Sequence, residues 1–532
     1  MKIAPLAAKL TALVVATVLG GAAALAFPAD ASESEVKVLV RVQPGTDAAV
    51  AQEVRALGGD TEKPLTILSG FFAKVSSDRV GAIEGLPGVV AVLRGADIGF
   101  DPALYDPEKI SSSLYQVAKN IGADEAWKDG YTGAGIDVAV IDSGVAPRPE
   151  FQGRLVNGAD LSFGSGDVPD GFDQFGHGTH MAGIIAGRDA AVSSDPETIR
   201  RSAKRNFVGI APGARIVNVK VAAPDGAVDV SQVIAGINWV VTHRASDGLN
   251  IRVLNLSFGT DGIQGYQIDP LTYAVENAWR NGIVVVVSAG NDGYGSSSLN
   301  NPAYDPFILA VGASDTNGTP GKSDDFIADF SSRGDRKRRP DVLAPGRSIV
   351  SLRAPGSLVD EIFPGARVNE NLFRGSGTSQ AAAVVSGAVA LLLDEYPNLT
   401  PDQVKAALVA TGLKLKTRKG ELLERGMKSI DVHKAADKVR DVREGKIASV
   451  QNFPVATGRG SLEGARGTEH VTDATGTILS GEIDVTGAPW DGRAWRAMSW
   501  TGRSWRGDGW NGRSWRGTGW LAAEFVPAEP LA

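Results

Sequence analysis

Three short segments of the chain carry side chains that could perform acid–base and nucleophilic chemistry. The first is an apolar run over residues 136–141, which ends at the carboxylate of Asp142. The second places His177 at the start of a glycine-containing helix pattern, and the third places Ser379 before a long apolar helix pattern. A serine at such a helix start has its hydroxyl in the positive field of the amide end. A carboxylate, an imidazole and a hydroxyl are groups that proton transfer and nucleophilic attack use.

These segments lie in a part of the chain, from about residue 131 onwards, where apolar runs alternate with helix-length patterns. This alternation predicts an α/β fold, a doubly wound parallel sheet with helices on both faces. Several expected strands end in small or polar residues. In parallel sheets of this kind, binding and catalytic sites lie at the carboxyl ends of the strands. The expected strands are 136–141, 215–221, 251–256, 283–287 and 308–311, with helices that include 230–242 and 271–281. Three of the strand ends read Asp142-Ser143-Gly144, Ser257-Phe258-Gly259 and Ala289-Gly290-Asn291.

Several motifs follow one another in an order that narrows the interpretation. Asp-Ser-Gly stands at 142–144, His-Gly-Thr-His at 177–180 and Gly-Thr-Ser at 377–379. The segment Asn-Leu-Ser-Phe-Gly at 255–259 lies between them. In these motifs and their order the chain resembles the subtilisin family of serine proteases, and the similarity extends over about residues 113–440. The resemblance implies a subtilisin-like catalytic domain.

The resemblance also implies a role for each matching residue. Ser379 would attack the scissile carbonyl, His177 would take up its proton and return it to the leaving amine, and Asp142 would orient the imidazole. Asn291 would donate its side-chain amide to the oxyanion. The edge of the strand at 257–259 would pair with extended polypeptide substrates, which favours broad specificity. The expected catalytic residues are therefore Asp142, His177, Ser379 and Asn291, and the expected substrate-binding residues are Ser257, Phe258, Gly259, Ala289 and Gly290.

Residues 1–31 have the layout of a secretory signal peptide. Lys2 and Lys9 precede an apolar stretch at 10–26, and Ala29-Asp30-Ala31 supplies a small-x-small cleavage pattern. An uncleaved membrane anchor is the alternative, but a stretch of about 17 residues is marginal for a membrane span. We therefore expect a secreted, extracellular protein, and leave association with the cell envelope open.

Residues 32–108 are expected to form a small α+β unit of their own. The pattern predicts strand, helix, strand, helix and strand in that order. The unit resembles the inhibitor-like propeptide of the subtilisin family, with a ferredoxin-like fold. The resemblance implies a zymogen whose cleft is occupied by this unit until the chain is cut within about residues 100–113. The expected strands are 36–42, 65–75 and 88–93, and the expected helices are 47–57 and 77–86.

The peptidase domain, residues 109–440, is followed by a glycine-rich segment at 441–485 that is weakly patterned and predicts a linker. The extension at 486–532 then repeats a tryptophan every fifth residue from Trp490 to Trp520. A step of five fits neither helix nor strand periodicity. Flat rings interleaved with arginines suit stacking on cell-wall glycans, whereas a tail that packs on itself needs no ligand. The alternative function is therefore a cell-envelope-binding protein whose proteolysis serves only its own maturation.

Composition limits the cofactors and partners. The chain has no cysteine, which excludes disulfide scaffolds, thiol catalysis and cysteine-ligated zinc. A net charge of −7 excludes a globally basic nucleic-acid binder. His177 and His180 lack the acidic helix motif of a zinc site, and we expect no metal in the active site. Asp167, Asp170 and Asp173 could hold a structural calcium ion, although their spacing matches no known loop, so this question stays open.

Overall fold

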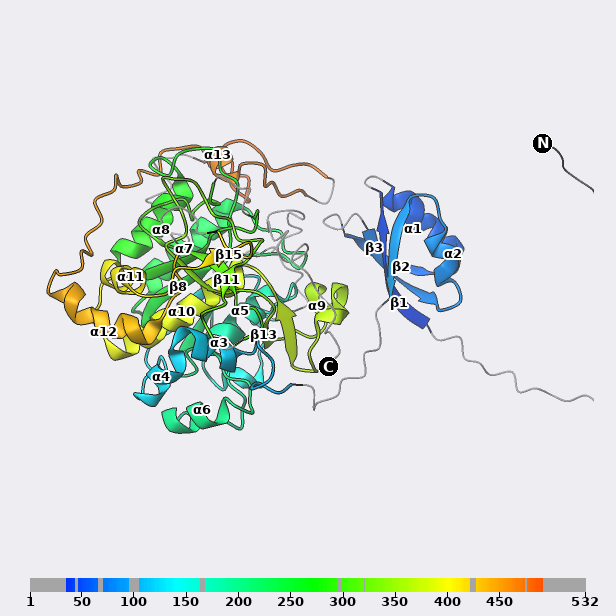
Figure 1. Cartoon of the computed structure of the whole chain (residues 1–532). Coiled ribbons are helices and arrows are strands. Elements are labelled where there is room, and N and C mark those ends of the chain that lie inside the picture. The colour runs from blue at the N-terminus through cyan, green and yellow to red at the C-terminus, as the bar shows by residue number, and fades with distance from the viewer. Residues whose placement is uncertain are drawn as a thin grey trace, which may run out of the picture.

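Figure 1 shows the computed structural model, in which a small N-terminal unit precedes a large α/β body. The structure describes residues 35–43, 46–65, 70–94, 105–162, 168–293, 298–319, 321–421, 427–473 and 476–490. The expected signal peptide and the tryptophan repeat beyond Trp490 lie outside these residues, so export and glycan binding stay predictions. Within the described ranges, no helix combines the length and the hydrophobicity needed to cross a bilayer.

The N-terminal unit is built on an antiparallel sheet. Its elements in chain order are β1 (Glu35–Val42), α1 (Asp47–Ala56), β2 (Asp60–Leu65), β3 (Gly70–Ser76), α2 (Val80–Glu84) and β4 (Val89–Arg94). The strand order β2-β3-β1-β4 and the βαββαβ sequence are those of a ferredoxin-like unit. The pattern predicts one strand over 65–75, which is wrong in part: β2 ends at Leu65 and β3 begins at Gly70. Alternate β1 residues Val38 and Val40 are buried against α1, as a half-buried strand requires.

The large body is organised around a sheet whose central strands run parallel. Its strands are β5 (Asp137–Asp142), β6 (Leu155–Asp160), β7 (Arg215–Lys220), β8 (Ile251–Leu256), β9 (Val284–Ser288), β10 (Leu309–Asp315), β11 (Phe326–Ile327), β12 (Val342–Pro345) and β15 (Lys416–Thr417). The spatial order is β15-β11-β10-β9-β8-β5-β7-β6, and β12 pairs with β10. The five strands expected from the apolar runs correspond to β5, β7, β8, β9 and β10. Every residue of β5 and β9 is buried, so both faces of the sheet are covered.

The helices of the large body pack on this sheet in two groups. Described helices are α3 (Leu114–Ile121), α4 (Ala123–Lys128), α5 (His177–Ala186), α6 (Pro196–Ser202), α7 (Val230–His243), α8 (Pro270–Arg280), α9 (Leu358–Ile362), α10 (Thr378–Glu395), α11 (Pro401–Ala410), α12 (Val432–Arg443) and α13 (Leu462–Arg466). α10 packs against α5 and the central strands, whereas α7 and α8 pack against each other. α10 is buried from Thr378 to Leu393, as its apolar sequence predicts. β13 (Ile349–Leu352) and β14 (Leu372–Gly375) form a separate two-stranded antiparallel sheet beside α5.

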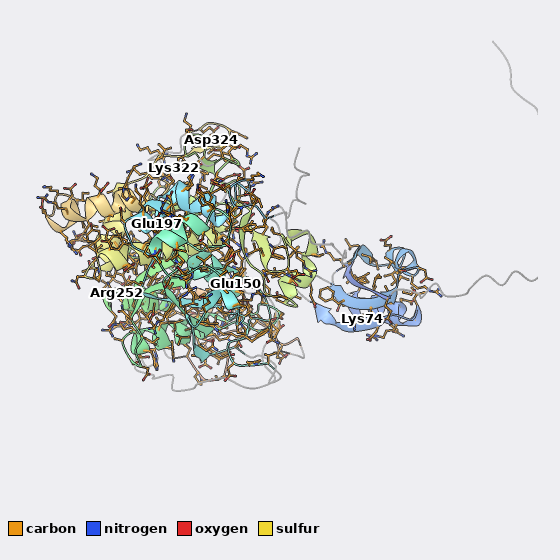
Figure 2. All side chains as sticks on the ribbon, turned by 90° about the horizontal axis from the view of Figure 1, so that it is seen from below. Lys74, Glu150, Glu197, Arg252, Lys322 and Asp324 are labelled. Carbon is orange, nitrogen blue, oxygen red and sulfur yellow. The ribbon has the colours of Figure 1, made fainter. Side chains whose placement is uncertain are left out.

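The N-terminal unit contacts the large body at α9. Both views place the two side by side (Figure 1, Figure 2). Phe72 of β3 is buried in a small apolar cluster with Ile362 of α9, and Leu358 and Phe363 pack against that cluster. Lys74, two residues further along the same strand, is exposed and marks this unit in Figure 2.

The segment at 441–485, predicted to be a linker, is packed onto the large body instead. α12 continues to Arg443, and Ala456, Leu462 and Leu479 are buried. Arg466 is fully buried as well. The sequence pattern was misleading because turns and polar contacts, rather than periodic elements, hold most of this segment in place.

Candidate active site

The carboxylate of Asp142 lies at the end of β5, at the carboxyl edge of the sheet. β5 is the central strand of three, since β7 and β8 pair with it on either side in parallel. Asp142 therefore stands between the two loops that follow β7 and β8. The Asp142 side chain has no exposed surface.

His177 is the first residue of α5 and binds Asp142 directly. Its Nδ1 lies 2.7 Å from Oδ1 and 2.9 Å from Oδ2 of the carboxylate, and the imidazole is also fully buried. Close approach of the two elements depends on Gly178, because a Cβ there would lie 2.1 Å from the Gly144 carbonyl oxygen. The structure thus brings together two of the three residues that sequence motifs singled out in distant parts of the chain.

Asp173 fixes the loop that leads into α5. Its Oδ1 accepts hydrogen bonds from the Ser143 hydroxyl at 2.9 Å and the Gly176 N–H at 2.6 Å. Its Oδ2 accepts from the Thr179 N–H at 2.8 Å and hydroxyl at 2.6 Å. Ser143 in turn donates its N–H to Asp142 at 2.8 Å, so one network holds the acid and the start of the histidine helix. Burial raises the pKa of Asp173, and these hydrogen bonds act against that rise.

This network is relevant to whether Asp173 could bind a structural calcium ion. Both oxygens of Asp173 are engaged by protein donors, so it does not present a free ligand. Asp167 lies outside the described residues. In the described part of the chain, no group of three or more histidine, aspartate or glutamate residues is placed to hold a metal ion.

Ser379 is the second residue of α10 and lies close to the start of α5. α5 and α10 pack against each other, and a Cβ at Gly375, the last residue of β14 and four residues before Ser379, would lie 3.2 Å from Nε2 of His180. Ser379 is 5% exposed. The Ser257 hydroxyl donates to the Ser379 carbonyl oxygen at 3.4 Å, which joins the end of β8 to the start of α10.

Asn291 follows β9 and is held by the residue before the serine. Its Oδ1 accepts from the Thr378 N–H at 2.8 Å and from the Thr378 hydroxyl at 3.0 Å. Since the side-chain oxygen is used in this way, the amide group Nδ2 faces the opposite direction. A Cβ at Gly377 would lie 3.5 Å from that Nδ2, so the amide is next to the turn that carries Ser379.

The expected substrate-binding residues line the same region. Ser257 and Phe258 are buried, and Gly259 passes so close to Asn300 that a Cβ would lie 2.8 Å from its Cβ. Gly290 has φ +109°, a left-handed conformation that favours glycine, and its N–H donates to the Thr378 hydroxyl at 3.3 Å. These contacts place the ends of β8 and β9 beside the start of α10.

His180 is buried beside Phe373 in an edge-to-face contact, with the ring centroids 6.5 Å apart. Burial, and secondarily the nearby His177, lowers its pKa to about 3. The sequence reasoning missed the anchoring roles of Asp173, Ser143 and Thr378. An available signal was that each lies within a few residues of an expected catalytic group.

Comparison with known proteins gives the class of protein. Residues 133–437 match the model of the Subtilase family. This range is more than half of the 532 residues and includes all of the elements that carry the site. The chain belongs to the subtilase family of serine proteases.

Two relatives in sequence agree with this assignment, and one solved structure is similar over part of the chain. Serine protease AprX of Bacillus subtilis (strain 168) is 38% identical over 313 residues, which are 57% of this chain and 68% of that protein. Subtilisin DY of Bacillus licheniformis is 32% identical over 318 residues, which are 59% of this chain and 96% of that protein. The crystal structure of a cold adapted subtilisin-like serine proteinase is 29% identical, with a TM-score of 0.41, and covers 57% of this chain and 89% of that chain.

Proposed function

We propose that the chain is a secreted serine endopeptidase that acts through Ser379, His177 and Asp142. The observation that carries the proposal is the fully buried contact between His177 Nδ1 and the Asp142 carboxylate. A carboxylate at Nδ1 holds the imidazole in the tautomer whose Nε2 accepts a proton. That nitrogen would accept the proton of the Ser379 hydroxyl at the start of α10.

The proposed reaction follows from these groups. The Ser379 hydroxyl oxygen forms a bond to the carbonyl carbon of the scissile peptide, and its proton passes to His177 Nε2. The carbonyl oxygen becomes an oxyanion, which accepts hydrogen bonds from Asn291 Nδ2 and the Ser379 N–H. The bond to nitrogen then breaks as His177 returns the proton to the leaving amine. A water molecule releases the acyl group by the same steps in reverse.

We assign polypeptide recognition to the backbone of residues 257–259, which follow the end of β8. An extended peptide would pair with the backbone of Ser257, Phe258 and Gly259, beside Ala289 and Gly290. The Ser257–Ser379 contact supports this assignment, because it puts the strand edge next to the proposed nucleophile. Backbone pairing is tolerant of side chains, so broad specificity is expected.

We also propose that the enzyme is made as a zymogen with residues 32–108 as its inhibitor. The contact of Phe72 with Ile362 supports this idea, since it attaches the N-terminal unit to the peptidase body. Secretion is supported by the leader pattern at 1–31 and by a relative from Thermus that is named an extracellular serine proteinase. The cut that releases the unit is expected within about residues 100–113.

A Ser379→Ala variant tests the proposal. We expect it to leave casein intact and to keep the mass of the unprocessed chain when the secreted protein is weighed by mass spectrometry. Ser246→Ala is the control, because Ser246 lies in the turn before the amino end of β8, opposite the strand end that contacts Ser379, and donates to the His243 carbonyl at 3.3 Å. Full casein hydrolysis by Ser379→Ala would overturn the assignment.

A further inference from the structure

The segment after α12 forms what we call the strap, residues 456–473 and 476–490. Its first half runs along the loop that follows β8. The contacts are backbone and side-chain hydrogen bonds over a continuous stretch, so the strap is attached there along its length. They include Thr457 N–H to the Gln267 carbonyl at 2.7 Å, Gly460 N–H to the Ile268 carbonyl at 2.6 Å, and the Thr260 hydroxyl to the Ala465 carbonyl at 2.5 Å.

The second half of the strap packs on the loop that follows β7. The Val485 N–H donates to the Ser231 hydroxyl at 3.3 Å, at the first turn of α7. A buried apolar cluster adds contacts that exclude water between the strap and this loop. The cluster consists of Val471, Leu479 and Val485 of the strap with Ala223 and Ala227 of the loop.

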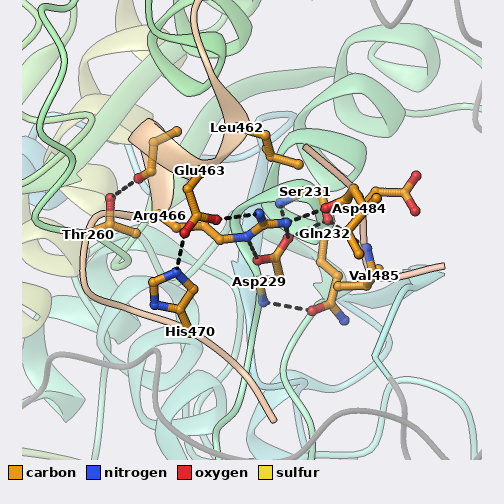
Figure 3. A network of polar contacts seen from close by, with 12 residues as sticks. Asp229, Ser231, Gln232, Thr260, Leu462, Glu463, Arg466, His470, Asp484 and Val485 are labelled. Carbon is orange, nitrogen blue, oxygen red and sulfur yellow. Dashed lines mark hydrogen bonds and ion pairs between the residues drawn. The ribbon is translucent and has the colours of Figure 1, made fainter. Parts of the chain in front are cut away.

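Arg466, in the last turn of α13, joins the two halves (Figure 3). Its Nε donates to Asp229 at 2.6 Å, and both side chains are fully buried. Its Nη1 donates to the Gly481 carbonyl at 2.7 Å, and its Nη2 to the Ile483 carbonyl at 2.5 Å. Asp229 is also the N-cap of α7, with a hydrogen bond from the Ser231 N–H at 2.9 Å. A buried, satisfied pair of this kind fixes geometry, since breaking it leaves an unpaired buried charge.

The topology gives the strap its position relative to the site. β7 and β8 flank β5, which ends at Asp142. The strap therefore connects the two loops on either side of the catalytic acid's strand. One of these loops begins with the proposed peptide-binding residues Ser257 to Gly259, and the strap is bonded to the next residue, Thr260.

The peptide-binding edge has a definite length. At one end, the Ser257 hydroxyl contacts the Ser379 carbonyl. At the other end, the Thr260 backbone is already paired, because its N–H donates to Asn301 at 3.0 Å and its carbonyl accepts from Asn301 at 2.8 Å. An extended chain rises ~3.3 Å per residue, so the edge accommodates about three substrate residues.

We propose that the strap bounds the substrate cleft on the Gly259 side, and that Arg466 and Asp229 are the residues that determine how much of a peptide is recognised there. The proposal rests on the proposed function, since it assumes that peptides pair with the backbone of residues 257–259, beyond the end of β8. It assigns a specificity role to a segment beyond the matched family range of 133–437.

The test uses the matured full chain and the double variant Arg466→Met with Asp229→Asn. Asparagine keeps the cap of α7, and removing both charges leaves no buried ion unpaired. Two peptide series are compared by kcat/KM, one lengthened before the scissile bond and one after it. In one series we expect the wild-type values to stop rising after about three residues. In the wild type, the strap's Ala465 carbonyl accepts from both the Thr260 hydroxyl and the Asn301 side-chain amide, so loosening the strap should allow the Thr260–Asn301 backbone pairing to open. For the variant, longer peptides should therefore continue to gain about five- to thirtyfold in kcat/KM, the worth of one or two more backbone hydrogen bonds.

The matched control is Arg215→Met with Asp137→Asn. This pair has contacts of 2.6 Å and lies at the amino ends of β7 and β5, at the opposite edge of the sheet. This control variant should show the same dependence of kcat/KM on peptide length as the wild type. If the Arg466 and Asp229 variant does not fold, Leu479→Ala loosens the strap without touching the ion pair. It should likewise let kcat/KM rise with peptides longer than about three residues.

A folded strap variant with the wild-type profile in both series would overturn the proposal while leaving the proposed function intact. Absence of any cleavage by the wild-type chain would overturn the proposed function, and this proposal with it.

Discussion

Asn291 is held in place by Thr378, which donates both its N–H and its hydroxyl to the asparagine side-chain oxygen. Thr378 directly precedes Ser379. The proposed oxyanion donor is therefore attached to the same turn that carries the proposed nucleophile, and the two keep a fixed spacing. Donors that are fixed before the reaction need no rearrangement as charge develops, which is the physical basis of oxyanion stabilisation.

Replacing Asn291 by leucine should lower kcat by about 10²–10³ with little change in KM, a magnitude known from subtilisins rather than derived for this chain. The reason is that Nδ2 acts only once the oxyanion has formed. Thr378→Val should lower kcat less, because the N–H of residue 378 still donates to the asparagine side chain. Steady-state hydrolysis of a short peptide anilide measures both constants. An unchanged kcat in Asn291→Leu would remove Asn291 from the mechanism.

Asp173 should act as a positioning residue for His177. Asp173→Asn turns its amide NH2 towards the N–H of either Gly176 or Thr179, which donate to different oxygens of Asp173, so at least one of the four hydrogen bonds is lost. We expect a loss of about 1–3 kcal/mol in the free energy of unfolding and a fall in kcat that exceeds any change in KM. Urea denaturation in the Ser379→Ala background and peptide kinetics in the active chain give the two quantities.

Asp195→Asn is the matched control for that variant. Asp195 caps α6 through the Thr198 N–H and hydroxyl, both at 2.8 Å, on the surface of the large body. It should lower stability slightly and leave kcat unchanged. If Asp173→Asn behaves in the same way, the network around Asp173 contributes to stability alone.

The sequence predicted those site residues that stand at the ends of apolar strand patterns. The apolar runs that became β5, β8 and β9 are continuous because both sheet faces are buried, and their ends carry Asp142, Ser257 and Asn291. The strap was not predictable in the same way. Its position depends on Arg466 meeting Asp229 across 237 positions of sequence, and no local pattern encodes such a contact.

The β2–β3 boundary shows the same limit on a smaller scale. The apolar run that predicts one strand over 65–75 contains residues of two strands that pair antiparallel with each other. Propensity and alternation identify strand residues, but where β2 ends and β3 begins depends on the pairing of β3 with β1 and with β2.

Phe72 should govern how long the N-terminal unit keeps the enzyme latent. Phe72→Ala exposes the apolar contact with Ile362, which should weaken binding by about 1.5–3 kcal/mol, or roughly 10- to 100-fold. Such a change appears mainly in the rate of dissociation. We therefore expect freshly secreted full chain to reach full casein hydrolysis sooner, and Ile362→Ala to have the same effect from the other side of the contact.

Val90→Ala is the control on the same unit. Val90 lies on β4 and is 56% exposed, so its truncation should leave the lag before full activity unchanged. Equal lags for Phe72→Ala and Val90→Ala would show that the contact with α9 does not limit activation.

Asp305 should make the large body less stable in alkaline solution. Burial, with the nearby Glu276, raises its pKa to about 8, against the lowering influence of Arg338 and Lys405. The folded state therefore binds this proton more tightly than the unfolded chain, so the contribution is fully present below about pH 4 and is lost as pH rises through about 8. Asp305→Asn mimics the neutral carboxyl. Its stability advantage over the parent should grow between pH 6 and pH 9.5, because the free energy of unfolding of the parent falls over that range. Urea midpoints in the Ser379→Ala background measure this, with exposed Asp324→Asn as the control; an advantage that is equal at the two pH values would contradict a protonated Asp305.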